Sequence, residues 1–234
     1  MTRVIKTTTT GRGLKKLLLV ALMILSSMTG KAQFNTDRLL MVGQSALYYE
    51  DYVLSIQYFN QVISAKPYLY EPWFYRGLAK FYLDDYQGAE NDCTEALGRN
   101  PFVVSVYELR GLCRIRQDNF AGAVKDYDKA LKYDPENRNL WHNRVLCHIQ
   151  QKEYDVALAQ IDTMLTRWSK NAKVYAMQAE VYMLQKDTTK AVVALDKSIA
   201  IDPYDGSRWR QKAIISMARH QCKESDEDLR QAIH

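Results

Sequence analysis

A spacing of 34 residues is the most constraining feature of this 234-residue chain. It separates five positions, which are Pro67, Pro101, Pro135, Ser169 and Pro203. A fixed period of this size is typical of a solenoid, in which one supersecondary unit is repeated along the chain. Proline disfavours the helical conformation in the residue before it, so each proline ends one unit and starts the next. We therefore expect six units, beginning near residues 36, 70, 104, 138, 172 and 206.

Large and small side chains recur at fixed places within these units. The fourth residue is always large: Leu39, Trp73, Tyr107, Trp141, Tyr175 and Trp209. A later residue is always small: Ser55, Ala89, Ala123, Ala157, Ala191 and Ser225. Apolar residues also recur at helical spacing, which predicts two amphipathic helices in each unit. Because glycine costs a helix about 1 kcal/mol relative to alanine, we expect Gly43, Gly77 and Gly111 on the first helices to lie against the small residues of the second.

The pattern resembles that of the tetratricopeptide repeat family, whose 34-residue signature is W-x2-L-G-x2-Y…A-x3-F…P. The best matches are Trp73, Gly77, Ala89, Ala96 and Pro101, followed by Tyr107, Gly111, Ala123, Tyr127, Ala130 and Pro135. The chain departs from the signature at Arg76, Arg110 and Arg144 (usually leucine) and at Lys80, Arg114 and His148 (usually tyrosine). The resemblance covers residues 36–234. It implies an all-α fold, a right-handed α-solenoid of about six helix-turn-helix repeats.

The residues before the repeats predict a cleavable secretory signal peptide over residues 1–32, followed by one solenoid domain over residues 33–234. Basic residues precede the apolar run Leu17–Leu25, and the small residues Gly30 and Ala32 come three and one before the expected cut. The run is too short for a membrane span, which needs about 20 residues; an uncleaved anchor is the alternative. We therefore expect export to the periplasm or cell envelope of a bacterium, with membrane contact only through this segment.

Charge gives no support for nucleic acid as a partner. The first 35 residues contain six Lys and Arg and no Asp or Glu, so 26 basic and 27 acidic residues remain in the repeats. The formal charge of +5 therefore comes from the amino-terminal segment.

The cysteines and histidines do not predict a chemical site. Cys93 and Cys113 would be close if each second helix packs on the following first helix, which allows a disulfide. The alternative is that they are small buried apolar residues. The four histidines lack metal-binding spacing, and no motif places a nucleophile beside a base. We expect no cofactor, no metal, no catalytic residue and no enzymatic activity.

Basic and acidic residues 16 positions apart predict ion pairs between the two helices of a unit. The pairs are Arg76 with Asp92, Arg110 with Asp126 and Lys212 with Asp228. The alternative is that all of them are solvated, because exposed ion pairs contribute little. Arg144 has Gln160 at this spacing, so we expect it to pair with Asp162 instead.

By resemblance to the family, the first helices line a concave groove that binds a partner. The groove residues expected from this are Leu40, Gln44, Tyr48, Phe74, Leu78, Tyr82, Glu108, Leu112, Arg116 and His142. We expect Tyr48, Phe74 and Tyr82 to form an exposed aromatic patch. A further row is apolar in all six units and is expected to be core: Leu47, Phe81, Ile115, Ile149, Met183 and Met217.

One subtype of the family clamps acidic carboxy-terminal tails with Lys, Asn and Arg, but Leu40 and Phe74 occupy the matching places here. We therefore expect a non-enzymatic scaffold whose partner is a protein or peptide segment with apolar anchor residues. The alternative is that the repeats form the N-terminal module of a larger envelope-assembly or sensory protein.

Overall fold

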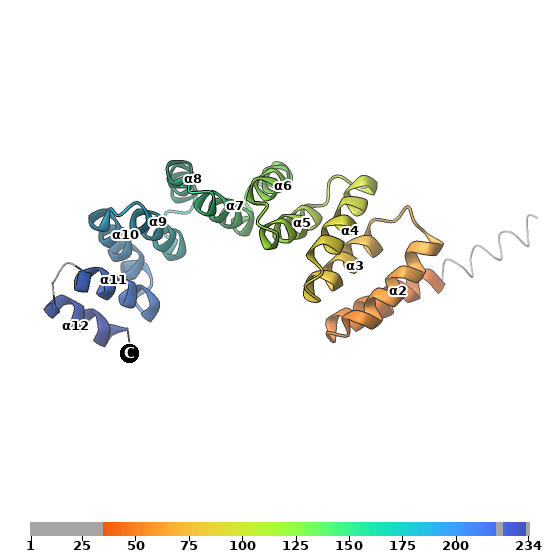
Figure 1. Cartoon of the computed structure of the whole chain (residues 1–234), viewed down its shortest axis with the longest axis horizontal. Coiled ribbons are helices and arrows are strands. Elements are labelled where there is room, and N and C mark those ends of the chain that lie inside the picture. The colour runs from red at the N-terminus through yellow and green to blue at the C-terminus, as the bar shows by residue number, and fades with distance from the viewer. Residues whose placement is uncertain (1–34, 219–221, 233–234) are drawn as a thin grey trace, which may run out of the picture. The chain divides into compact units, whose positions relative to one another are not determined.

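The computed structural model describes the backbone of residues 35–218 and 222–232, and this part of the chain is helical with no strand (Figure 1). The first helices of the six pairs are residues 35–48, α3 (Glu71–Tyr82), α5 (Val104–Arg116), α7 (Arg138–Gln150), α9 (Ala172–Leu184) and α11 (Gly206–Ala218). The second helices are α2 (Tyr52–Ala65), α4 (Tyr86–Arg99), α6 (Phe120–Tyr133), α8 (Tyr154–Arg167), α10 (Thr188–Ile201) and α12 (Cys222–Gln231).

Each second helix begins 34 residues after the one before it, so the period seen in the sequence is the period of the structure. Within the pairs, α3 packs on α4, α5 on α6, α7 on α8, α9 on α10 and α11 on α12. The predicted all-α fold of repeated helix pairs is confirmed. The predicted signal peptide lies outside the described residues. Among the helices that are described, none combines the length and the hydropathy needed to cross a membrane.

The turn between the two helices of a pair is also repeated, and it explains why the pairs are antiparallel. One residue in each of five turns has a positive φ of 58–63°: Glu50, Asp84, Asp118, Lys152 and Lys186. The next residue closes a Schellman motif, as when the Asp85 N–H donates to the Lys80 carbonyl at 3.0 Å. The Asp85 side chain then caps α4 by accepting from the Gly88 N–H at 2.9 Å. A single residue therefore ends one helix and begins the next.

Contacts divide the chain into two compact units, residues 1–101 and 102–234, which we call unit 1 and unit 2. In unit 1, Phe59 and Val62 of α2 are completely buried. In unit 2, Val145, Ile161 and Val181 belong to one cluster across α7, α8 and α9, and a second cluster joins α9, α10 and α11. Each unit therefore has apolar side chains buried within itself.

Glycine packing differs from the expectation. A methyl group at Gly77 would meet Ala89 O and Asp92 Cβ at 3.2 Å, so Gly77 does lie against the small residue of α4. At Gly43 and Gly111 the expectation is wrong, because the nearest atoms belong to the rings of Phe59 and Tyr127. The absence of a side chain makes room for an aromatic ring at these two positions.

Replacing Gly111 with alanine should therefore destabilise the protein by about 1–2 kcal/mol. The added methyl would lie 2.8 Å from Tyr127 Cε1, and this overpacking outweighs the gain in helix propensity. Gly98 is the matched control, since a methyl there meets nothing within 4 Å and Gly98→Ala should stabilise by about 0.5–1 kcal/mol. Urea unfolding followed by circular dichroism measures both; equal effects of the two substitutions would contradict the packing argument.

The apolar row expected to be core is buried only in part. Ile149 is 5% exposed, but Met183 and Met217 are 37% and 47% exposed, so the expectation is wrong for these two. The start of the second helix explains the difference for Met183. Phe81 packs against Tyr86, the first residue of α4, at a ring distance of 5.5 Å. The corresponding residue of α10 is Thr188, which is too small to cover Met183 in the same way.

Candidate functional site

A hollow of about 550 Å³ lies in unit 1 and involves the helix of residues 35–48, α2 and α3. Four of its lining residues are tyrosines, and we call it the tyrosine hollow. It is lined by Gln44, Leu47, Tyr48, Glu50, Tyr52, Tyr75, Leu78 and Tyr82.

The tyrosines are held by contacts with one another and with the core. Tyr52 is the first residue of α2 and Tyr82 the last of α3, and their rings stack with centroids 5.1 Å apart. Tyr75 stacks on the buried ring of Phe59 at 5.7 Å. Tyr48 and Tyr82 are nevertheless 81% and 54% exposed. The hollow therefore exposes aromatic surface to solvent, and contacts with neighbouring rings hold its tyrosines in place.

Four of the predicted groove residues line this hollow together: Gln44, Tyr48, Leu78 and Tyr82. Leu40 is half-buried and is not among the lining residues. Phe74, expected in the exposed patch, is also half-buried, and its ring lies 5.1 Å from that of Tyr75.

The sequence reasoning missed Glu50, Tyr52 and Tyr75 as lining residues, because it considered one face of each first helix: Tyr75 lies on α3 outside that face, and Glu50 and Tyr52 lie beyond the first helix. A signal for Tyr52 was present. Aromatic residues open four successive second helices at the 34-residue spacing: Tyr52, Tyr86, Phe120 and Tyr154.

The groove residues predicted in unit 2 are more polar. Glu108 and Leu112 of α5 are half-buried and Arg116 is exposed. Burial, and then the nearby Asp134, raise the pKa of Glu108 above its ordinary value. His142 of α7 lines two hollows of about 520 and 250 Å³ together with Lys173 and Arg208.

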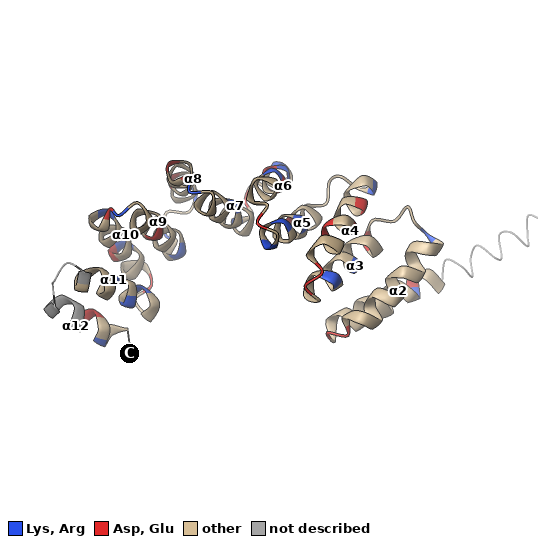
Figure 2. Ribbon diagram, in the orientation of Figure 1, with Lys and Arg blue, Asp and Glu red and all other residues tan. Residues whose placement is uncertain are grey.

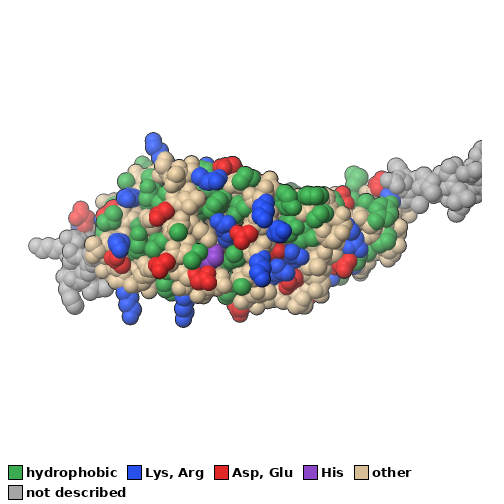
Figure 3. Space-filling model, turned by 90° about the horizontal axis from the view of Figure 1, so that it is seen from above, with side chains coloured by type: hydrophobic (Ala, Val, Ile, Leu, Met, Phe, Trp, Pro, Cys, Tyr) green, Lys and Arg blue, Asp and Glu red, His purple; other side chains and the backbone are tan. Residues whose placement is uncertain are grey.

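Burial, and then the positive charge of Lys173, lower the pKa of His142. The His142 imidazole is therefore expected to be neutral at neutral pH. Hydrophobic, basic and acidic side chains are interspersed over the face seen in Figure 3.

The predicted ion pairs between the two helices of one repeat are confirmed. Arg76 binds Asp92 through two hydrogen bonds, of 2.9 Å from Nε and 2.5 Å from the terminal nitrogen. Arg110 binds Asp126 in the same bidentate way, at 3.0 and 2.6 Å. Both aspartate side chains are only 3% exposed. Lys212 lies 3.6 Å from Asp228.

The first-helix position that carries Arg76 in the second repeat carries Gln178 in the fifth and Lys212 in the sixth. It also contacts the second helix of the preceding repeat, 16 residues earlier. Arg76 donates to Asn60 at 2.6 Å, Gln178 to Asp162 at 3.2 Å, and Lys212 lies 3.0 Å from Asp196. This side chain therefore bridges two consecutive repeats.

The contact with the preceding repeat corrects the expectation for Arg144. Arg144 binds Asp128 at 2.8 Å and Gln160 Oε1 at 3.0 Å, and not Asp162. Its guanidinium reaches back to α6, while Asp162 accepts its hydrogen bond from Gln178 of the next repeat.

Comparison with known proteins identifies this architecture. The family model for the tetratricopeptide repeat matches residues 74–138, 114–172 and 148–206, which together span more than half of the chain. The chain belongs to the tetratricopeptide repeat family. No curated protein matches this tetratricopeptide chain in sequence.

Solved structures of tetratricopeptide proteins resemble it. One, from Parabacteroides merdae ATCC 43184, is 17% identical, with 85% of this chain and 77% of that chain covered and a TM-score of 0.64. PilW, described as a type IV pilus biogenesis factor, is 17% identical over 82% and 90%, at a TM-score of 0.65. YrrB, described as having an unusual peptide-binding site, is 14% identical over 70% and 85%, at a TM-score of 0.62. Likeness at these identities shows the fold of the tetratricopeptide solenoid.

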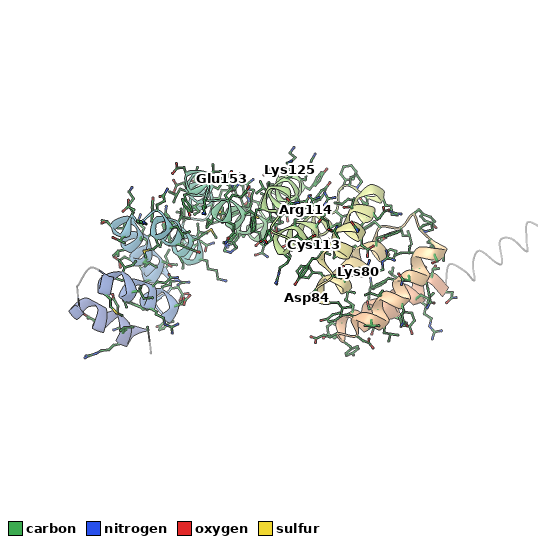
Figure 4. The ribbon with its side chains drawn as sticks, in the orientation of Figure 1. Lys80, Asp84, Cys113, Arg114, Lys125 and Glu153 are labelled. Atoms are coloured by element: carbon green, nitrogen blue, oxygen red, sulfur yellow. The ribbon has the colours of Figure 1, made fainter. Side chains whose placement is uncertain are left out.

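The departures of this tetratricopeptide chain from the family signature have a shared structural role. Lys80 and Arg114, which are labelled in Figure 4, stand at the place of the usual tyrosine. They lie 2.8 Å from Asp92 and Asp126, respectively. Each buried carboxylate is therefore held by two basic side chains of the first helix. In the fourth repeat Gln160 replaces the aspartate, and His148 contacts Glu153 instead, at 2.6 Å.

Cys93, Cys113 and Cys147 of the tetratricopeptide chain are buried thiols that form no disulfide with one another. This agrees with the alternative in which they pack as small apolar residues. Burial raises the pKa of the Cys147 thiol to about 12, so that thiol stays protonated at neutral pH. Within the part of the chain that the structure describes, no group of three or more His, Cys, Asp and Glu is placed to hold a metal ion.

Proposed function

We propose that the chain is a non-enzymatic scaffold that binds a segment of a partner protein along its first helices, with the tyrosine hollow as the main contact. The observation that carries the proposal is the exposure of Tyr48 and Tyr82 beside a hollow of about 550 Å³. The tetratricopeptide fold is typical of protein-interaction scaffolds, which supports the same conclusion.

The hollow has the physical properties of an anchor site. Tyrosine buries a large area on binding and has few rotamers to fix, so it contributes strongly to protein interfaces. The Tyr52–Tyr82 stack and the contact of Tyr75 with Phe59 hold these rings before a partner arrives. Little ordering of the scaffold is then needed on binding. Leu47 and Leu78 add apolar surface for an anchor residue of the partner.

Substituting Tyr48 and Tyr82 with alanine should weaken capture of the partner about tenfold or more, because both exposed rings are removed. The measurement is affinity capture from bacterial envelope extract with the immobilised full chain, followed by titration of the retained protein. Tyr68→Ala, Tyr204→Ala is the matched control. These tyrosines are 68% and 91% exposed but do not line the hollow, so capture should be unchanged.

Equal retention by the wild type and the Tyr48/Tyr82 variant, with the same helical content, would contradict the proposed site. Loss of retention in the Tyr68/Tyr204 control as well would show that exposed tyrosines act nonspecifically. Either outcome would move the partner site away from the tyrosine hollow.

We also propose that the chain is exported and loses residues 1–32. The support is the sequence pattern of a basic start, an apolar core and small residues before Gln33. Intact-mass measurement of the protein made in a bacterial host should give a chain that begins at Gln33. A full-length mass in the envelope fraction would indicate the uncleaved anchor instead.

A further inference from the structure

Acidic residues lie in the two turns beside the tyrosine hollow. Glu50 lines it directly, and Asp51 follows in the same turn. Asp84 and Asp85 occupy the equivalent turn between α3 and α4, where Figure 4 labels Asp84. The Tyr52–Tyr82 stack joins the two turns, because Tyr52 follows Asp51 directly and Tyr82 lies two residues before Asp84. Figure 2 shows acidic residues at both turns.

These four carboxylates are not neutralised by basic side chains in the described part of unit 1. Asp51 and Asp85 accept backbone N–H groups of Leu54 and Gly88, and Asp84 accepts the hydroxyl of Tyr86. Hydrogen bonds of this kind leave the negative charge in place.

Most basic residues in the described part of unit 1 are engaged elsewhere. Residues 35–101 contain five Lys and Arg against nine Asp and Glu. Four of the five form ion pairs with other carboxylates: Lys66 with Asp37, Arg76 and Lys80 with Asp92, and Arg99 with Glu95. The turns beside the hollow therefore keep an excess of negative charge.

Aromatic faces and carboxylates attract the same kind of ligand. A ring carries negative charge density on its face, so it binds Arg and Lys side chains, and a neighbouring carboxylate strengthens this attraction. We propose that the tyrosine hollow takes a basic side chain, arginine or lysine, carried next to an apolar residue by a segment of the partner protein. This rests on the proposed function and names the chemistry of its partner.

Other ligand classes fit the hollow less well. An acidic segment would meet like charge at both turns. A purely apolar segment would cover the Glu50 carboxylate without providing a partner for it, which costs free energy. Unit 2 provides a contrast, since its hollow of about 520 Å³ is lined by four basic residues, Arg138, Lys170, Lys173 and Arg208, and by one acidic residue, Asp202. No tyrosine lines that hollow, so the combination of tyrosine rings with a carboxylate distinguishes the tyrosine hollow from it.

Two peptides of matched size test the inference. One is acetyl-Ala-Leu-Arg-Leu-Ala-amide, and in the other citrulline, a neutral isostere, replaces the arginine. Calorimetric titration of the full chain at low ionic strength should show about fivefold to tenfold tighter binding of the arginine peptide. Glu50→Gln should remove most of this preference. Glu227→Gln changes the net charge equally on an exposed residue of α12, a second helix, and should leave the preference intact.

The outcomes separate this inference from the proposed function. Equal affinity for the two peptides, with both lost in the Tyr48/Tyr82 variant, would overturn the basic ligand and leave the hollow as a peptide site. Absence of saturable binding of the arginine peptide up to millimolar concentration would also overturn it. The proposed function itself is contradicted by the capture experiment, when the Tyr48/Tyr82 variant retains the partner as well as the wild type does or when the Tyr68/Tyr204 control also loses it.

Discussion

Replacing Asp126 with alanine should destabilise the protein by about 3–5 kcal/mol. The Asp126 side chain is 3% exposed and accepts hydrogen bonds from two guanidinium groups, Arg110 at 2.6 and 3.0 Å and Arg114 at 2.8 Å. Removing the carboxylate leaves Arg110 and Arg114 side chains, which are 15% and 19% exposed, close together without this anion. The cost is therefore the burial and mutual repulsion of two positive charges, added to the loss of the hydrogen bonds.

Glu136→Ala is the matched control for this substitution. Glu136 pairs with Arg167 at 2.8 Å, but the Arg167 and Glu136 side chains are 40% and 66% exposed, so the loss should stay below about 1 kcal/mol. Urea unfolding gives the overall change. Hydrogen exchange of the α5 and α6 amides gives the change in local stability. The local value matters because repeat proteins need not unfold in a single step. Similar losses for both variants would show that burial of the carboxylate is unimportant.

The repeat fold could be predicted because it depends on local spacing. The prolines at positions such as Pro101 and Pro135 mark where one pair ends, and the second helices do begin 34 residues apart. The ion pairs between the two helices of a repeat could be predicted for the same reason, because Arg76 and Asp92 lie on adjacent helices joined by one short turn. Periodicity along the chain thus determines contacts between consecutive helices.

Contacts between successive pairs could not be predicted in this way. The bond from Arg144 to Asp128 reaches back to the preceding repeat, and the sequence alone does not give the angle at which pairs pack. The candidate site shows the same limit. Tyr48 and Tyr82 were found from first-helix positions, but Tyr52 enters the hollow from a second helix by stacking on Tyr82. Such a site is formed by tertiary packing, so only the part that lies on one face of a single helix can be predicted from sequence spacing.

Replacing Phe59 with alanine should destabilise unit 1 by about 3–4 kcal/mol. Phe59 is completely buried, and its ring fills the space beside Gly43, where a methyl group would lie only 2.7 Å from Phe59 Cε1. Truncation leaves a cavity that the neighbouring helices can close only partly. It also removes the ring on which Tyr75 stacks, so the base of the tyrosine hollow loses support.

The effect of Phe59→Ala should be local, which distinguishes it from general misfolding. Hydrogen exchange should speed up in α2 and α3, while amides of α7, α8 and α9 keep their protection, because the core cluster of unit 2 is made from its own helices. Phe102→Ala is the matched control: Phe102 is 67% exposed, and its loss should change stability by less than about 0.5–1 kcal/mol. Partner capture should fall for Phe59→Ala and persist for Phe102→Ala. Equal loss of protection in both units after Phe59→Ala would show that they unfold as one, and the tyrosine hollow would then depend on the stability of the whole chain.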